Sequence, residues 1–136
     1  MNARLRRLVW ERAGSHCEDC LVHQEFDLLP QHVDHVIARK HKGPDAAENL
    51  ALACVNYSLA KGPNIAGRDS RTGKLTPLFH PRTQVWSDHF RWNGPSVAGR
   101  TAVGRATVAV LNMNLPDRVA LRQMLIADGL FPPADS

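Results

Sequence analysis

An aspartate and a histidine stand side by side at Asp34-His35, within the apolar, β-branched run 32–37. Hydrolysis of a phosphodiester needs a base that deprotonates water, and imidazole suits this task because its pKa lies near neutrality. It also needs a hard divalent cation, for which an aspartate supplies an oxygen ligand. An amide such as Asn49 can clamp the local backbone and so hold the imidazole in a productive orientation. These residue types therefore indicate metal-assisted hydrolysis of a phosphodiester.

The spacing of the pair sets a condition on this chemistry. Adjacent residues on a strand point to opposite faces, so Asp34 and His35 share one site only at a bend or a strand end. The segment ARKHKGP, residues 38–44, supplies that break. A second interpretation is that the pair arises by chance and that Glu48-Asn49-Leu50 is an ordinary helix start, since short motifs have a high false-positive rate.

The chain has three cysteines, and Cys17 and Cys20 have the spacing C-x-x-C, with Cys54 further on. No apolar run approaches the ~20 residues of a membrane span. Residues 1–20 lack the apolar core of an export signal. We therefore expect a cytoplasmic protein with reduced thiols, in which the C-x-x-C favours a metal over a disulfide.

The net charge of +4 and the pI near 9.3 favour a polyanionic partner, although many soluble proteins are this basic. Given the motif, we expect three cations to contact phosphates, with salt-sensitive and sequence-independent affinity: Arg39, Lys40 and Lys61. We expect three others to be solvated: Arg6, Arg7 and Lys42.

The segment 78–90 holds three polar residues that are candidates for a supporting role at the site, since each can bind a phosphate oxygen: His80, Arg82 and His89. The alternative is that these side chains satisfy buried backbone groups. The aromatic residues between them, Phe79, Trp86 and Phe90, are expected in the core.

The N-terminal half predicts two helices and a strand. Apolar spacing predicts a helix over 2–13 that ends at Gly14, and the β-branched content of 32–37 predicts a strand. A second helix is predicted over 46–61, with Asp45 as N-cap, Glu48 as its capping-box partner and Gly62-Pro63 as the stop. Asn49 would then lie on that helix.

The C-terminal half predicts a turn over 68–75, a strand-turn-strand unit over 89–97 and helices over 102–113 and 115–129. Pro116 begins the last helix and Gly129 ends it. The two helices are expected to pack on the rest or to form a dimer surface, and residues 130–136 are expected to fray. We find no repeat or linker, so we expect one α+β domain over 1–136.

In order and spacing, these motifs resemble the HNH endonuclease family, whose pattern is a C-x-x-C knuckle, V-D-H-[IV], a basic loop with glycine, [ED]-N-L, a second C-x-x-C and N-x-x-K-G. Here the pattern reads Cys17-x-x-Cys20, Val33-Asp34-His35-Val36, His41-Lys42-Gly43, Glu48-Asn49-Leu50, Cys54-x-x-Tyr57, Ser58 and Lys61-Gly62. The agreement covers residues 8–65, with the motif core at 17–65. Segments 64–92 and 99–122 also resemble a bacterial branch of the family.

The resemblance implies a ββα-metal core with an N-terminal helix and two C-terminal helices. It implies metal-dependent cleavage of DNA, or less often RNA. Carried over by position, His35 is the general base, Asp34 is a ligand of a catalytic Mg²⁺ or Mn²⁺, and Asn49 fixes the His35 loop. The third motif position, a second metal ligand, falls on Ser58.

Two positions depart from the family pattern. Tyr57 stands where a fourth zinc-binding cysteine is expected, so Cys17, Cys20 and Cys54 either hold a structural zinc with another ligand or pack as small buried residues. The candidates for that other ligand are His16, His23, Asn56 and water. Ser58 is a weaker metal ligand than imidazole or an amide oxygen.

Three functions therefore compete. The first is a DNA endonuclease with one divalent cation, and the second is a degenerate HNH module that binds nucleic acid without cutting it. The third is a small metal-binding scaffold whose basic loop serves an acidic protein. Cleavage of a plasmid separates the first from the second, and failure to bind DNA at low salt favours the third.

Overall fold

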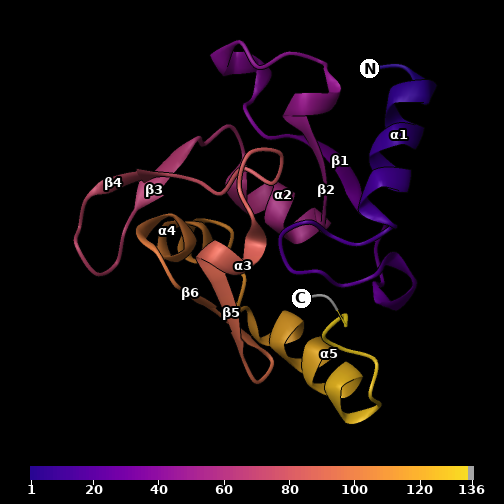
Figure 1. Ribbon diagram of the computed structural model, residues 1–136, viewed down its shortest axis with the longest axis vertical. Coiled ribbons are helices and arrows are strands. Elements are labelled where there is room, and N and C mark those ends of the chain that lie inside the picture. The colour runs from indigo at the N-terminus through magenta and orange to yellow at the C-terminus, as the bar shows by residue number, and fades with distance from the viewer. Residues whose placement is uncertain (135–136) are drawn as a thin grey trace.

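Residues 1–134 are described by a computed structural model, in which helices combine with three two-stranded antiparallel sheets (Figure 1). The α+β class expected from the sequence is confirmed. No helix among these residues is long and apolar enough to cross a membrane.

Helix α1, Ala3–Ala13, begins at Asn2, whose Oδ1 accepts the N–H of Leu5 at 2.8 Å. It ends at Gly14, which has the left-handed φ of 59° that glycine adopts without steric cost. The helix buries Val9 against Leu50 and Leu52 of strand β2. Both ends lie within a residue of the predicted positions.

Strands β1, His32–His35, and β2, Leu50–Ala53, pair antiparallel, with His35 opposite Leu50. Helix α2, Val55–Lys61, follows β2 after one residue and ends at Gly62. Figure 1 shows this unit beside α1. The ββα core with an N-terminal helix is therefore present.

The helix predicted over 46–61 is wrong in its first half. Residues 47–49 form a single 3₁₀ turn, 50–53 form β2, and neither Asp45 nor Glu48 caps a helix. All four residues of β2 are buried, and each lies opposite a residue of β1 in the antiparallel pair. This pairing overrides the weak helix preference of alanine and leucine, because propensity is a small term beside tertiary burial.

The C-terminal half contains two hairpins and three helices. Strands β3, Ala66–Arg68, and β4, Leu75–Pro77, flank the predicted turn, and β5, Phe90–Asn93, and β6, Ser96–Gly99, form the predicted strand-turn-strand unit. The helices are α3, Trp86–His89, α4, Ala102–Val110, and α5, Pro116–Ala127. Helix α4 packs on β6 and on the β3–β4 hairpin (Figure 1).

The larger core joins the two halves of the chain. It brings the cysteines of the N-terminal half together with Phe79, Phe90 and residues of α4 and α5. The rings of Phe79 and Phe90 meet edge to face at 5.1 Å between centroids, and Trp86 lies 5.2 Å from Phe90. The expectation that these aromatic residues belong to the core is confirmed.

The frayed tail predicted for 130–136 is wrong at Phe131. This side chain is 6% exposed, and its ring meets that of Trp92 at 4.8 Å. Burial of a large aromatic side chain outweighs the usual mobility of a chain end. Residues 135–136 of the predicted tail lie outside the described residues.

Candidate active site

The loop after β1 is held closed by Asn49, which is 3% exposed. Its Oδ1 accepts the N–H of Ile37 at 2.9 Å, and its Nδ2 donates to the carbonyls of Ile37 and Pro44, each at 3.0 Å. Gly43 passes so close that an added Cβ would overlap the Ile37 carbonyl oxygen. The amide therefore joins both ends of the loop that follows His35.

The imidazole of His35 is held by Asp45, on the far side of this loop. His35 Nε2 lies 2.7 Å from Asp45 Oδ1, and Arg39 donates two hydrogen bonds to the same carboxylate, at 3.1 and 3.0 Å. The hydrogen bonds from Arg39 and then from His35 lower the pKa of Asp45. Asp45 is therefore an ionised acceptor at neutral pH, and it fixes the orientation of the His35 ring.

Asp34 lies on the opposite face of β1. Its carboxylate lines a pocket with Asp19, Lys61, Phe79 and other residues, and Lys61 Nζ is 3.9 Å from Asp34 Oδ2. Burial raises the pKa of Asp34, and the charge of Lys61 opposes this rise. The carboxylate is therefore partly desolvated, with one ammonium as its nearest cation.

The expectation that Asp34 and His35 meet at a bend is corrected by this geometry. Both residues belong to the regular ladder of β1, opposite Ala51 and Leu50, so their side chains alternate between faces. The strand breaks only after His35. The structure brings His35 together with Asp45 and Arg39, whereas Asp34 lies with Asp19 and Lys61.

Lys61 is inside the protein rather than on its surface. Its side chain is 11% exposed, and Nζ donates to the carbonyls of His35 and Val36, each at 2.8 Å. The expected contact between Lys61 and a nucleic-acid phosphate does not agree with this position, because α2 directs its last turn at β1. Arg39 and Lys40 are exposed, as a phosphate contact requires.

Ser58 precedes Lys61 by three residues on α2, a spacing that places both on neighbouring parts of the helix surface. It is half-buried, and its hydroxyl makes no hydrogen bond within residues 1–134. Ser58 is not among the residues that line the Asp34 pocket. Its assignment as a metal ligand remains a prediction.

The cysteine motif forms a buried cluster. Cys17, Cys20 and Cys54 are at most 1% exposed, and their sulfurs lie within 4.8 Å of one another. Cys17 Sγ accepts the N–H groups of Asp19, Cys20 and Cys54, each at 3.4 Å. Burial works against ionisation of Cys20, but hydrogen bonds from Cys17 and Cys54 outweigh it and lower the pKa. Three sulfurs in this arrangement could hold a metal ion.

The candidates for a fourth ligand do not join this cluster. The rings of His16 and His23 meet edge to face at 4.8 Å between centroids, and neither residue belongs to the group of potential ligands. Tyr57, at the fourth cysteine position, is buried, and its hydroxyl lies 3.0 Å from Arg122 Nη1. The site described by residues 1–134 therefore offers three protein ligands.

We compared the chain with models of known protein families. Residues 17–56 match the family model of the HNH endonuclease, a segment that contains the cysteine cluster, Asp34, His35 and Asn49. The similarity to the HNH endonuclease is therefore shown for this segment of the chain. No curated protein and no solved structure matches the chain. Domains of this family bind metal and generally act on nucleic acids.

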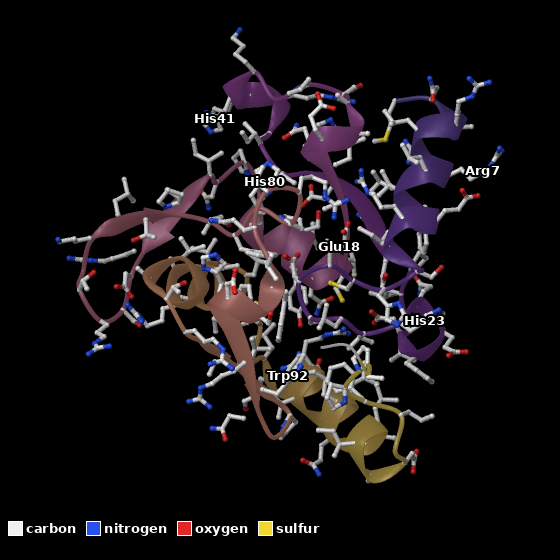
Figure 2. The ribbon with its side chains drawn as sticks, in the orientation of Figure 1. Arg7, Glu18, His23, His41, His80 and Trp92 are labelled. Carbon is white, nitrogen blue, oxygen red and sulfur yellow. The ribbon has the colours of Figure 1, made fainter. Side chains whose placement is uncertain are left out.

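Two of the three supporting residues lie near the HNH domain. Arg82 donates to Glu18, whose other oxygen accepts the N–H of Leu52 at 2.9 Å, and burial lowers the pKa of Arg82 to about 10. His80 lines a mostly apolar cavity of about 420 Å³ together with Val36. Burial lowers the pKa of His80, and the charge of Lys61 adds to the effect. Figure 2 shows Glu18 and His80 near the middle of the molecule.

His89 lies apart from the HNH domain. Its Nδ1 is 2.7 Å from the hydroxyl of Thr101, and its ring is 5.9 Å from that of Phe79. This agrees with a structural role at the junction of α3 and α4. Arg7, expected to be solvated, projects from the outer side of α1 in Figure 2.

Sequence reasoning missed Asp19 and misassigned Asp45. The carboxylate of Asp19 accepts no hydrogen bond within residues 1–134, and burial, with a smaller effect of Cys20, raises its pKa to about 7. Asp19 stands inside the C-x-x-C motif, where its residue type gives no distinctive signal. Asp45 was assigned to a helix cap, because only the folded loop brings it to His35.

Proposed function

We propose that this HNH domain is a metal-dependent endonuclease that hydrolyses phosphodiester bonds of DNA, with His35 as its general base. The observation that carries the proposal is the 2.7 Å contact between His35 Nε2 and Asp45, in a loop that Asn49 holds closed. A histidine that only fills space does not need a carboxylate partner and a clamped loop. A base that must present one nitrogen to water needs both.

The Asp45 contact determines which nitrogen of His35 is free. An ionised carboxylate only accepts hydrogen bonds, so Nε2 carries the proton and donates to Asp45. Nδ1 then keeps its lone pair and accepts the proton of the attacking water. The positive charge that forms on the ring is stabilised by the same carboxylate. The role of Asp45 is therefore positioning, through His35.

Asp34 is the residue that would hold the divalent ion, and Ser58, which does not line the Asp34 pocket, is a second ligand by motif position alone. The carboxylates of Asp34 and Asp19 share a pocket with the single ammonium of Lys61, and such oxygen donors suit Mg²⁺ or Mn²⁺. When bound, the ion would neutralise the phosphate and stabilise the leaving oxygen. Asp34 reaches this pocket from the same strand that carries His35.

The exposed cations of the loop would bind the substrate. Arg39 and Lys40 belong to the loop that follows His35 and face solvent, where they can contact phosphates of DNA. Arg39 already pairs with Asp45, so a phosphate that binds Arg39 lies close to the proposed base. We place this activity in the cytoplasm, where Cys17, Cys20 and Cys54 stay reduced, as they are in this structure.

A second function is binding of nucleic acid without cleavage. The observation that favours it is the ammonium of Lys61, 3.9 Å from the Asp34 carboxylate, where it competes with a divalent cation. Ser58 at the third motif position adds to this account. RNA as the substrate class follows the same reasoning and needs a separate substrate in the assay.

The test is nicking of supercoiled plasmid with Mg²⁺, Mn²⁺, Ni²⁺ or Zn²⁺ by the full chain. We expect His35→Ala to abolish nicking and Asp45→Asn to lower kcat by about 10²–10⁴-fold, because the base is lost or misoriented. His41→Ala, a change at an exposed histidine in the same loop, is the matched control and should cut normally. Cleavage by His35→Ala at the parent rate would refute the base assignment. Binding without cleavage under all four metals would favour the second function.

A further inference from the structure

The nuclease proposal does not explain why the cysteine cluster lacks a fourth metal ligand. A structural zinc site is closed by four protein ligands. Here the three cysteines are at most 1% exposed, so the cluster is buried. Among residues 1–134, no imidazole or carboxylate lies close enough to all three sulfurs to complete the set, and the Asp27 carboxylate approaches the sulfur of Cys54 alone, at 3.4 Å. The residues present therefore do not fit a closed structural zinc site.

A guanidinium from the C-terminal helix stands beside the cluster instead. Arg118 of α5 is 7% exposed, and its Nη2 donates to Cys54 Sγ at 3.0 Å. The same guanidinium donates to both oxygens of Asp27, at 2.8 and 3.3 Å. Asp27 Oδ2 lies 3.4 Å from Cys54 Sγ. Sulfur, carboxylate and guanidinium thus form one compact group.

Tyr57 belongs to the same arrangement. The guanidinium carbon of Arg118 lies 5.7 Å from the centre of the Tyr57 ring, within the range of a cation–π contact. The Tyr57 hydroxyl lies 3.0 Å from Arg122 Nη1 and 3.5 Å from the Met113 carbonyl, which turns it toward α5. Tyr57, which occupies the position of the fourth cysteine, therefore packs its ring against the guanidinium of Arg118.

We propose that Arg118 is a protein-supplied cation that takes the place of the structural zinc, so that the cysteine cluster is metal-free. Asp27 holds the guanidinium, Cys54 accepts its hydrogen bond and Tyr57 supports its face. A buried cation needs such partners, because an unpaired charge in the interior is costly. Relative to the family pattern, this chain differs twice. Tyrosine replaces the fourth cysteine, and the guanidinium of Arg118 replaces the zinc ion.

The exchange also changes which element holds the knuckle together. A zinc ion would join the Cys17–Cys20 turn to the start of α2, where the N–H of Cys54 already donates to Cys17 Sγ at 3.4 Å. Here α5 adds a further connection, because Arg118 contacts both Cys54 and Asp27 of the segment that follows the knuckle. The N-terminal HNH domain therefore depends on a helix more than 60 residues away in the chain, since Cys54 and Arg118 are separated by 64 residues.

The test is the metal content of the reduced full chain, produced in zinc-supplemented medium and measured by elemental analysis. Cobalt(II) titration supplies a second measurement, because thiolate-to-cobalt charge-transfer absorption reports sulfur ligands and ignores a metal at Asp34. We expect well under one zinc per chain, no such absorption and the same Tm with and without a chelator. About one tightly bound zinc per chain, with thiolate absorption from cobalt, would overturn the proposal.

Variants of the two exchanged residues sharpen the test. The double variant Tyr57→Cys/Arg118→Ala should gain about one zinc per chain and the thiolate–cobalt absorption. It restores four sulfur ligands and removes the guanidinium that lies beside Cys54. Tyr57→Phe, which keeps the ring under Arg118, is the matched control and should stay metal-free. A soluble double variant that binds no metal would contradict the proposal that Arg118 takes the place of the zinc ion. None of these measurements uses nicking, so their outcome is independent of the nuclease proposal.

Discussion

Gly43 offers the sharpest test of the loop that presents His35. A Cβ at this position would overlap the Ile37 carbonyl oxygen and come within 2.8 Å of Asn49 Nδ2. Both neighbours belong to the clamp, and neither is the free end of a flexible side chain. Gly43→Ala therefore forces the loop away from Asn49 by about 1 Å or more, since ordinary carbon contacts begin near 3.5 Å.

The cost follows from the hydrogen bonds that this movement breaks. Asn49 makes two hydrogen bonds with Ile37 and one with Pro44, and each contributes about 1 kcal/mol to stability. We expect Gly43→Ala to lower the free energy of unfolding by about 2–3 kcal/mol. If His35 is the base, a misplacement of about 1 Å should also lower the nicking rate by about 10²-fold.

The assay combines urea unfolding with plasmid nicking under conditions where both proteins are folded. Gly94→Ala is the matched control: Gly94 has a left-handed φ of 57° but nothing within 4 Å of an added Cβ, and it lies in the β5–β6 turn. That control should lose about 1–2 kcal/mol of stability and keep full nicking. Nicking by Gly43→Ala at the parent rate would refute the claim that the closed loop positions His35.

Two further changes test the electrostatics and the core. The pKa of Asp19 is raised to about 7 in the fold, so the folded state binds more protons than the unfolded state between about pH 4 and 7, and stability falls as pH rises through this window. Asp19→Asn should therefore raise the free energy of unfolding at pH 8 by about 1–3 kcal/mol and leave it unchanged near pH 4. Urea titrations at the two pH values measure both free energies. Phe131→Ala should cost about 3–5 kcal/mol, because it empties the space against Trp92; a Tm equal to that of the parent would show that the chain end is not part of the core.

Local patterns were sufficient where neighbouring residues decide the structure. Helix α1 and its end at Gly14, the turn between β3 and β4, the β5–β6 hairpin, and α5 between Pro116 and Gly129 all follow from apolar spacing and from residues with special backbone preferences. Segment 50–53 was predicted as helix because alanine and leucine favour helices in isolation. It is a strand because β1 supplies hydrogen-bonding partners that the local sequence does not reveal.

The motif residues and their partners divide in the same way. Asp34, His35, Asn49 and the three cysteines were singled out by residue type and spacing, since chemistry restricts both. Their partners come from distant or irregular segments, and only tertiary structure brings them into contact.

The amino-acid sequence by itself determined the α+β class, the HNH resemblance and the atoms that could do chemistry. Only the tertiary structure decided that Asp34 and His35 face opposite sides of β1, that Lys61 is buried and that Arg118 stands at the cysteine cluster. The physical reason is that a local pattern records the preferences of a few neighbouring residues. The position of a charge depends on burial and on partners tens of residues away, as the 64 residues between Cys54 and Arg118 show.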